Sequence, residues 1–233
     1  MNTVKGIIFD YGGTIDTNGT HWAQVIREQY IKAGLTINDK LFRDTYVYGE
    51  RSLAKSPIIE PTDTFCTLLE KKIAIHREYL NGVMSNTQQK DIARGCYQRV
   101  LETMEKTRNV VERLSKHYPM VLVTNFYGNM PTVLKEFALE EYFIKIVESS
   151  VVGIRKPDPA LFALGVEALS LPPADIIVIG DSYRKDIFPA HTLGCRTVWI
   201  KGVGWEEETP QPDAQPDAII KSLEELPTLL LPH

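Results

Sequence analysis

Short apolar runs rich in valine and isoleucine open the chain and recur through its second half. The five clearest runs are residues 4–9, 120–123, 144–147, 176–179 and 197–200. Most of them are nearly continuous rather than alternating, which is typical of strands that are covered on both faces. Helical patterns separate the later runs, at residues 130–137, 159–169 and 186–193. This alternation predicts a doubly wound, Rossmann-like α/β fold around a parallel sheet.

The pattern changes between the first and second predicted strands. Amphipathic spacing near 3.6 residues occurs there in three segments, residues 21–33, 64–80 and 86–104. No strand pattern accompanies them, so an all-helical insert enters after the first strand and leaves before the second. We expect an α/β core of residues 1–15 and 108–233 and a helical, cap-like domain of residues 16–107.

Composition and charge narrow the classes of function. The 233 residues carry 30 acidic and 26 basic side chains, a net charge of −4, which disfavours a broad nucleic-acid surface. A small anionic substrate remains possible because a bound metal can reverse the local sign. The three cysteines are widely separated and form no zinc or disulfide pattern. No apolar run approaches 18 residues, so we expect no membrane span and a cytoplasmic location. The sequence assigns no oligomeric state.

An acidic residue follows the first predicted strand. Asp10 is followed by Tyr11 and by the pair Gly12 and Gly13. A carboxylate at this end of a parallel strand lies where open α/β sheets bind ligands, and two glycines allow the backbone to approach a ligand closely. Taken alone, Asp10 could equally cap a turn, with the glycines letting the chain leave the sheet.

Three later segments place polar residues just after strands or before helices. The second strand ends in Thr124 and Asn125, and Lys156 precedes a helix. A later strand ends in Asp181, with Asp186 five residues beyond it. Each has an ordinary structural explanation, as a helix cap, a surface lysine or a turn acid. Because a parallel sheet would gather them at one edge, their joint occurrence in this order indicates a functional site.

In order, the four sites resemble the motifs of the haloacid dehalogenase-like (HAD) superfamily. Those motifs are D-x-D-G-T, a strand ending in Thr or Ser, a Lys usually followed by Pro, and G-D-S-x-x-x-D. The most specific matches are residues 153–159 and 180–186. The helical insert is similar to the family's C1-type cap by position only. The resemblance therefore covers most of the core and implies an enzyme that acts on a phosphorylated small molecule.

The resemblance implies a metal site for Mg²⁺. Asp10 and Asp181 would be direct ligands, and the backbone carbonyl of Gly12 would be a third. Asp186 would support the site from close by, partly through water. Carboxylates, carbonyls and waters are the ligands that Mg²⁺ prefers.

The same resemblance implies which residues would attack and hold the phosphoryl group. Asp10 would attack phosphorus as the nucleophile, while Thr124 and Lys156 would hold the phosphoryl oxygens and complete the catalytic set. Asn125 and the backbone amides after Asp10, including Gly13, would add hydrogen bonds.

The chain departs from the family pattern at Gly12. Phosphatases of the family usually carry a second Asp there, which protonates the leaving group and then activates water. Loss of a positioned acid or base typically costs roughly 10²–10⁴-fold in rate. Three explanations remain open: another group such as Asp16 supplies the proton, the substrate has a good leaving group, or the protein binds a phospho-ligand with little or no turnover.

Other members of the superfamily that lack the second Asp offer alternatives. Haloacid dehalogenases lack the G-D-S-x-x-x-D site, so carbon–halogen cleavage is disfavoured. Phosphonatases carry a small residue at the position of Gly12 and use a cap lysine as a Schiff base. The lysines expected in this cap are Lys32, Lys40, Lys55, Lys71 and Lys72. Polar cap residues that could face the cleft are His21, Arg43, Arg51 and His76.

The sequence thus predicts an Mg²⁺-dependent phosphatase or phosphoryl-transfer enzyme that works through an aspartyl-phosphate on Asp10. Low or specialised activity is expected because of Gly12. The alternatives are a catalytically inactive phospho-ligand-binding protein on the same fold and a phosphonatase-like C–P hydrolase.

Overall fold

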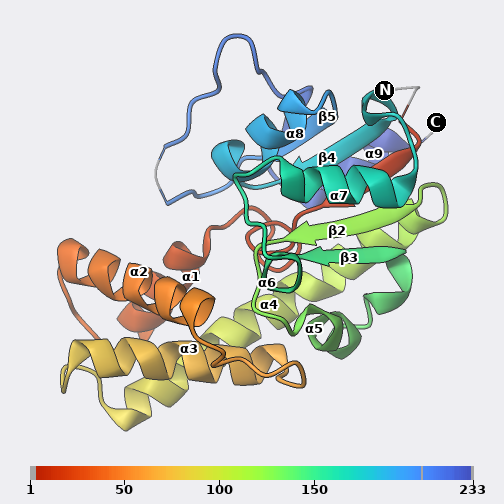
Figure 1. Ribbon diagram of the computed structural model, residues 1–233. Helices are drawn as coiled ribbons and strands as arrows, with labels where there is room; N and C mark the ends of the chain where they lie inside the picture. The colour runs from red at the N-terminus through yellow and green to blue at the C-terminus, as the bar shows by residue number, and fades with distance from the viewer. Residues whose placement is uncertain (1–3, 206, 232–233) are drawn as a thin grey trace.

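The computed structural model describes residues 4–205 and 207–231, and its core is a six-stranded sheet. The order is β3-β2-β1-β4-β5-β6, and every neighbouring pair is parallel (Figure 1). The strands are β1 Gly6–Phe9, β2 Met120–Thr124, β3 Lys145–Glu148, β4 Ile176–Gly180, β5 Arg196–Ile200 and β6 Ala218–Ile220. This confirms the doubly wound α/β fold predicted from the sequence.

Both faces of the sheet are covered, because successive strand side chains point to opposite sides. Ile8 of β1 packs in a buried cluster with Phe162, whereas its neighbours Ile7 and Phe9 belong to the larger cluster on the other face. The helices of the core are α5 Met130–Glu136, α6 Ser149–Val152, α7 Ala160–Leu169, α8 Phe188–Thr192 and α9 Leu226–Leu230. Short helical turns occur at Glu140–Tyr142, Pro173–Asp175, Tyr183–Ile187 and Leu223–Glu225.

The chain between β1 and β2, all of it described, contains helices and no strand. These helices are α1 Trp22–Lys32, α2 Asp39–Lys55, α3 Phe65–Leu80 and α4 Asn86–Ser115. The first residues of the last three are capped by the side chains of Asn38, Thr64 and Ser85, which accept backbone N–H groups. Although α4 has 30 residues, neither it nor any other described helix is long and apolar enough to cross a membrane.

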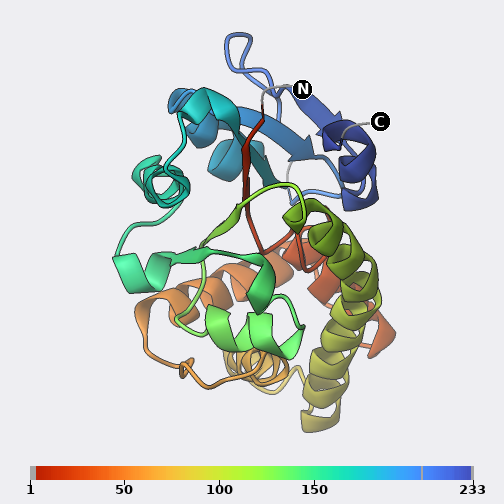
Figure 2. The same cartoon turned by 90° about the vertical axis from the view of Figure 1, so that its right-hand side faces the viewer.

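Helix α4 connects the helical insert to the sheet. Figure 2 shows it running from the insert to the flank of the core. The expected boundary between residues 107 and 108 falls inside this uninterrupted helix, so no linker marks the exit from the insert. The division of the chain into 16–107 and the remainder stays a prediction.

Two of the differences from the predicted elements bear on the site. The sequence patterns did not single out α2, Asp39–Lys55. A single helix was predicted at residues 186–193, but a π-helical turn over Tyr183–Ile187 comes first and α8 follows at Phe188. The wider π turn places Asp186 beside the end of β4, where its Oδ2 accepts a hydrogen bond from the Ser182 N–H at 3.1 Å.

The packing of α7 on the sheet yields a test of the core. A Cβ at Gly165 would lie 2.7 Å from Val123 Cγ2 and 3.1 Å from Ile8 Cδ1, so the helix approaches the strands closely only because this side chain is absent. We predict that Gly165→Val destabilises the protein by roughly 1–3 kcal/mol through overpacking. Urea unfolding measures this change, with exposed Glu167→Ala as a control; equal stability of the two variants would contradict the packing.

Candidate active site

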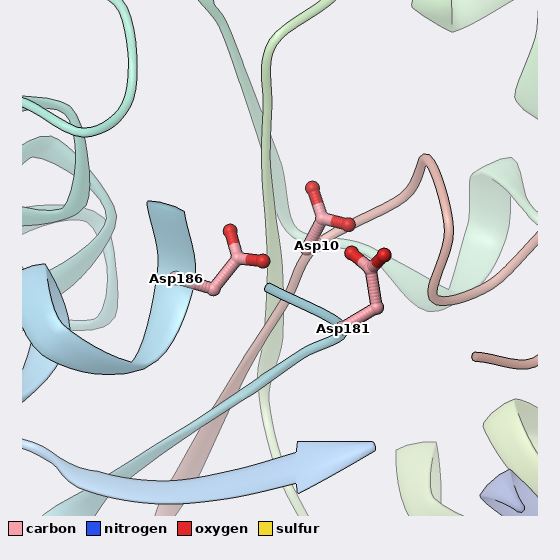
Figure 3. A group of neighbouring side chains, drawn as sticks. All are labelled: Asp10, Asp181 and Asp186. Carbon is pink, nitrogen blue, oxygen red and sulfur yellow. The ribbon is translucent and has the colours of Figure 1, made fainter. Parts of the chain in front are cut away.

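The predicted site residues meet at the carboxyl edge of the sheet. Asp10 follows β1 and Asp181 follows β4, and these two neighbouring strands flank the point where the strand order reverses. Figure 3 shows the carboxylates of Asp10, Asp181 and Asp186 converging, the first from the loop after β1 and the other two from the chain that follows β4. One ligand oxygen from each lies within 4.8 Å of the others. The fold therefore brings together residues that are up to 176 positions apart in the sequence.

Lys156 lies between two of these acids. Its Nζ is 2.6 Å from Asp10 Oδ1 and 2.7 Å from Asp186 Oδ1, and all three side chains are buried. Burial alone would lower the pKa of Lys156, but the charges of Asp10 and Asp186 outweigh it and hold the pKa above its ordinary value. The lysine is therefore charged and fixes the nucleophile candidate in place. Thr14 Oγ1 donates to the other oxygen of Asp10 at 2.9 Å.

The acids repel one another where they are poorly hydrated. Burial, together with the charge of Asp186, raises the pKa of Asp10 to about 6 against the opposing charge of Lys156. Desolvation, then Asp10 and Asp186, raise the pKa of Asp181 well above its ordinary value. One lysine cannot neutralise three carboxylates, so the cluster favours a further cation. Its all-oxygen ligand set fits a hard divalent ion such as Mg²⁺.

The residues predicted to hold phosphate take different positions. Thr124 is buried at the end of β2, and its Oγ1 is without a hydrogen-bond partner among the described residues. Asn125 instead braces Lys156: its Oδ1 accepts the Lys156 N–H at 2.9 Å and its Nδ2 donates to the Lys156 carbonyl at 3.2 Å. The Gly13 N–H donates to Asp16 Oδ1 at 2.7 Å, which engages the amide expected to face phosphate. Thr124 and Lys156 thus have the groups best placed to meet an anion.

The adjacent glycines Gly12 and Gly13 differ in the space around them. Gly13 has a φ of +98°, and a Cβ there would lie 2.3 Å from Asp181 Oδ2, so only glycine fits. A Cβ at Gly12 would meet no heavy atom of the described residues within 4 Å, and Gly12 lines the cavity. The space that a side chain would fill at position 12 is therefore open.

A cavity of about 820 Å³ opens over the acids, and the helical insert forms its far wall. This size is within the usual range of small-molecule sites. Of the polar cap residues that could face the cleft, His21 lines the cavity, whereas His76 is buried within the insert, with its Nδ1 2.8 Å from the Tyr30 hydroxyl. Of the candidate lysines, Lys72 lines the cavity.

Sequence patterns missed an ion pair on this wall. Lys72 Nζ lies 2.6 Å from Glu50 Oε1, and the Tyr127 hydroxyl donates to Glu50 Oε2 at 2.8 Å. Burial opposes the charge of Glu50, but Lys72 holds its pKa down to about 2. In the same way Glu50 overcomes the effect of burial and raises the pKa of Lys72. No spacing rule joins residues 50, 72 and 127, so only the fold could reveal this group.

Asp16, considered as a substitute proton donor, is fully buried and does not line the cavity. Its two oxygens accept hydrogen bonds from the Gly13 N–H and from Trp22 Nε1, each at 2.7 Å. It therefore joins the loop after Asp10 to the first helix of the insert. This geometry gives Asp16 a positioning role.

Asp16 predicts a pH effect on stability. Burial raises its pKa from 3.8 to about 7, against the hydrogen bonds from Gly13 and Trp22. The folded state then holds this proton more tightly than the unfolded state, so its contribution to stability is present below pH 3.8 and lost as pH rises through about 7. Asp16→Asn should flatten the decline in unfolding free energy between about pH 4 and 7. Parallel wild-type and variant profiles in urea unfolding would contradict this.

Comparison with known proteins places the chain in a family. The model of the haloacid dehalogenase-like hydrolases matches residues 4–194. Haloacid dehalogenase-like hydrolase domain-containing protein 3 of Danio rerio is 31% identical over 109 residues, 47% of this chain and 44% of that protein. The chain thus matches less than half the length of that curated relative.

A second relative and a solved structure match nearly the whole chain. N-acylneuraminate-9-phosphatase of Rattus norvegicus is 25% identical over 252 residues, covering 99% of this chain and 95% of that protein. The magnesium-bound HAD-hydrolase YfnB of Bacillus subtilis superposes with a TM-score of 0.58 at 17% identity, over 98% of this chain and 99% of the other, which shows a common fold. The chain belongs to the haloacid dehalogenase-like hydrolase family.

Proposed function

We propose that the protein is an Mg²⁺-dependent hydrolase of small phosphomonoesters that works through an aspartyl-phosphate on Asp10. The observation that carries this proposal is the contact of Lys156 with both Asp10 and Asp186, beside a third carboxylate at Asp181. Such a cluster combines a nucleophile with the positive charge that an incoming phosphate requires. Phosphatases among the relatives of the chain support the same class of substrate.

Each side chain takes a defined part in this proposal. Asp10 presents an oxygen to phosphorus, and Lys156 orients that oxygen and draws in the phosphoryl group. The free hydroxyl of Thr124 donates to a phosphoryl oxygen. Asp10, Asp181 and the Gly12 carbonyl would hold Mg²⁺, with Asp186 in support. The ion would supply the positive charge that offsets the phosphate dianion.

The helical insert completes the proposed enzyme as a C1-type cap. Its α1 begins at Trp22, close behind the loop after Asp10, and α2 and α3 contribute Glu50 and Lys72 to the far wall of the cavity. This position supports a role in shaping the space for the leaving group. We assign the selection of the substrate to this wall.

The proposal predicts loss of activity in Asp10→Asn. The amide cannot form the phosphoenzyme, so Mg²⁺-dependent release of phosphate from phenyl phosphate should fall to the uncatalysed background. Removal of Mg²⁺ by a chelator should have the same effect and be reversible. The control is Asp158→Asn, an exposed position at which the side chain accepts the Ala160 N–H and asparagine can do the same. Undiminished release by Asp10→Asn would refute the proposal.

A second candidate function is binding of a phospho-ligand without turnover, and the open space at Gly12 favours it. The variant Gly12→Asp distinguishes the two candidate functions. Because nothing described lies within 4 Å of the new Cβ, the carboxyl can enter the cavity and act on the leaving group. We predict a gain of about 10²–10⁴-fold in kcat/KM for alkyl phosphates, with Gly12→Ala as the steric control. No gain over Gly12→Ala would favour the binding protein.

Phosphonatase chemistry remains a third candidate with weaker support. Its cap lysine must be neutral to form an imine with a carbonyl substrate. Lys72 is the candidate lysine at the cavity, but Glu50 raises its pKa and keeps it charged. This ion pair supports a binding role for Lys72.

A further inference from the structure

One wall of the cavity is aromatic near the loops that follow Asp10 and Thr124. Trp22, Phe65 and Phe126 all line the cavity. The Phe65 ring lies 5.7 Å from Trp22 and is stacked 6.4 Å from Phe126, centroid to centroid. Phe126 is two residues beyond Thr124, and Trp22 is tied through Asp16 to the Gly13 N–H. These rings therefore begin beside the proposed phosphoryl site.

A second aromatic group lines the cavity as well. Tyr46 and Trp205 are stacked at 4.9 Å, and His21 lies 5.9 Å and 5.7 Å from them. Tyr46 and His21 come from the insert and its entry, whereas Trp205 comes from the loop after β5. Flat apolar surfaces from both parts of the chain thus enclose the space, an arrangement that suits a planar group.

The charges nearest the first wall cancel each other. Lys72 Nζ lies 5.8 Å from the ring centroids of both Trp22 and Tyr127, and Glu50 neutralises it at 2.6 Å. The pair offers polar contacts without a net charge. An uncharged ring with a polar substituent fits this wall better than a second phosphate or carboxylate does.

The absence of a side chain at position 12 independently restricts the leaving group of the substrate. Gly12 offers no proton, which favours a leaving oxygen that is stable as an anion. A phenolic hydroxyl has a pKa of about 10, whereas that of an aliphatic alcohol is roughly that of water, about 16. A phenolate therefore leaves far more easily without an acid, and it also carries the flat ring that the cavity walls suit.

From these two observations we infer that the substrates are aryl phosphates, phosphomonoesters of a hydroxyl on a planar aromatic ring. This inference rests on the proposed function and specifies its substrate class. The ring lies at the wall that Trp22, Phe65 and Phe126 line, where Trp22 is partly exposed, and its phosphate meets Asp10. A phenolate leaving group then needs no acid at position 12.

The reaction balances without an acid from the protein. An Asp10 oxygen forms a bond to phosphorus as the bond from phosphorus to the ring oxygen breaks, and the electron pair leaves on that oxygen. The aryloxide takes a proton from solvent. Water then attacks phosphorus, and the bond to Asp10 breaks with its electron pair returning to the carboxylate. The phosphate is released with both hydrogens of the water and passes one of them to solvent, which balances the proton taken by the aryloxide.

The first experiment compares phenyl phosphate with benzyl phosphate, which carries the same ring on an aliphatic oxygen. In the wild type, kcat/KM for phenyl phosphate should exceed that for benzyl phosphate by about 10²-fold or more, the effect of a missing acid. In Gly12→Asp the ratio should shrink at least about tenfold, because the new acid assists the poorer leaving group.

The second experiment tests the ring contact with Trp22→Ala and Trp22→Phe. Both variants lose the indole hydrogen bond to Asp16, so their difference isolates the aromatic face. Trp22→Ala should have a kcat/KM for phenyl phosphate about 3–10-fold below that of Trp22→Phe. The two variants should act equally on acetyl phosphate, which has a good leaving group and no ring.

The outcomes separate the inference from the proposed function. Equal wild-type kcat/KM for phenyl and benzyl phosphate, or equal activity of the two Trp22 variants on phenyl phosphate, would overturn the aryl class while phosphate release still supports the phosphatase. Failure to release phosphate from all three compounds with Mg²⁺ present would overturn the proposed function itself.

Discussion

The ammonium of Lys156 is the contact on which the rest of the site depends. It lies within 2.7 Å of two buried carboxylates that would otherwise repel each other at the edge of the sheet. Asn125 holds the backbone of this lysine from the end of β2, and the π turn places Asp186 on its other side. The strand order therefore brings Asp10 and Asp186 to one shared positive charge on Lys156. The negative charge that remains in the cluster, which includes Asp181, favours a divalent cation.

The insert and the catalytic loop are joined by a second buried acid. Asp16 accepts one hydrogen bond from Gly13 and one from Trp22, so the loop that carries Asp10 and the aromatic wall share a single anchor. Gly13 cannot carry a side chain because Asp181 occupies that space, whereas Gly12 faces open space. The close contact with Asp181 thus requires glycine at position 13, whereas position 12 has room for a side chain and lacks one. Under the proposed function, such a site would rely on its substrate for a good leaving group.

The sequence predicted the sheet and the gathering of the four motifs well, because buried strands are continuous apolar runs and strand ends meet at one edge. It missed α2, whose buried positions include Thr45 and Gly49, so the apolar signal is broken. Gly49 is small because a Cβ there would lie 2.5 Å from His76 Nε2. Pairing of Glu50 with Lys72 follows from the packing of α2 on α3, which no local pattern records. The roles of the site residues remain predictions.

The most direct test is a crystal structure of the protein with Mg²⁺ and beryllofluoride, a stand-in for the phosphoryl group. The account predicts beryllium bonded to an Asp10 oxygen, Mg²⁺ shared by Asp10 and Asp181, and contacts from Lys156 and Thr124 to fluorine atoms. Beryllofluoride on another residue, or an ion that fails to join Asp10 with Asp181, would contradict it.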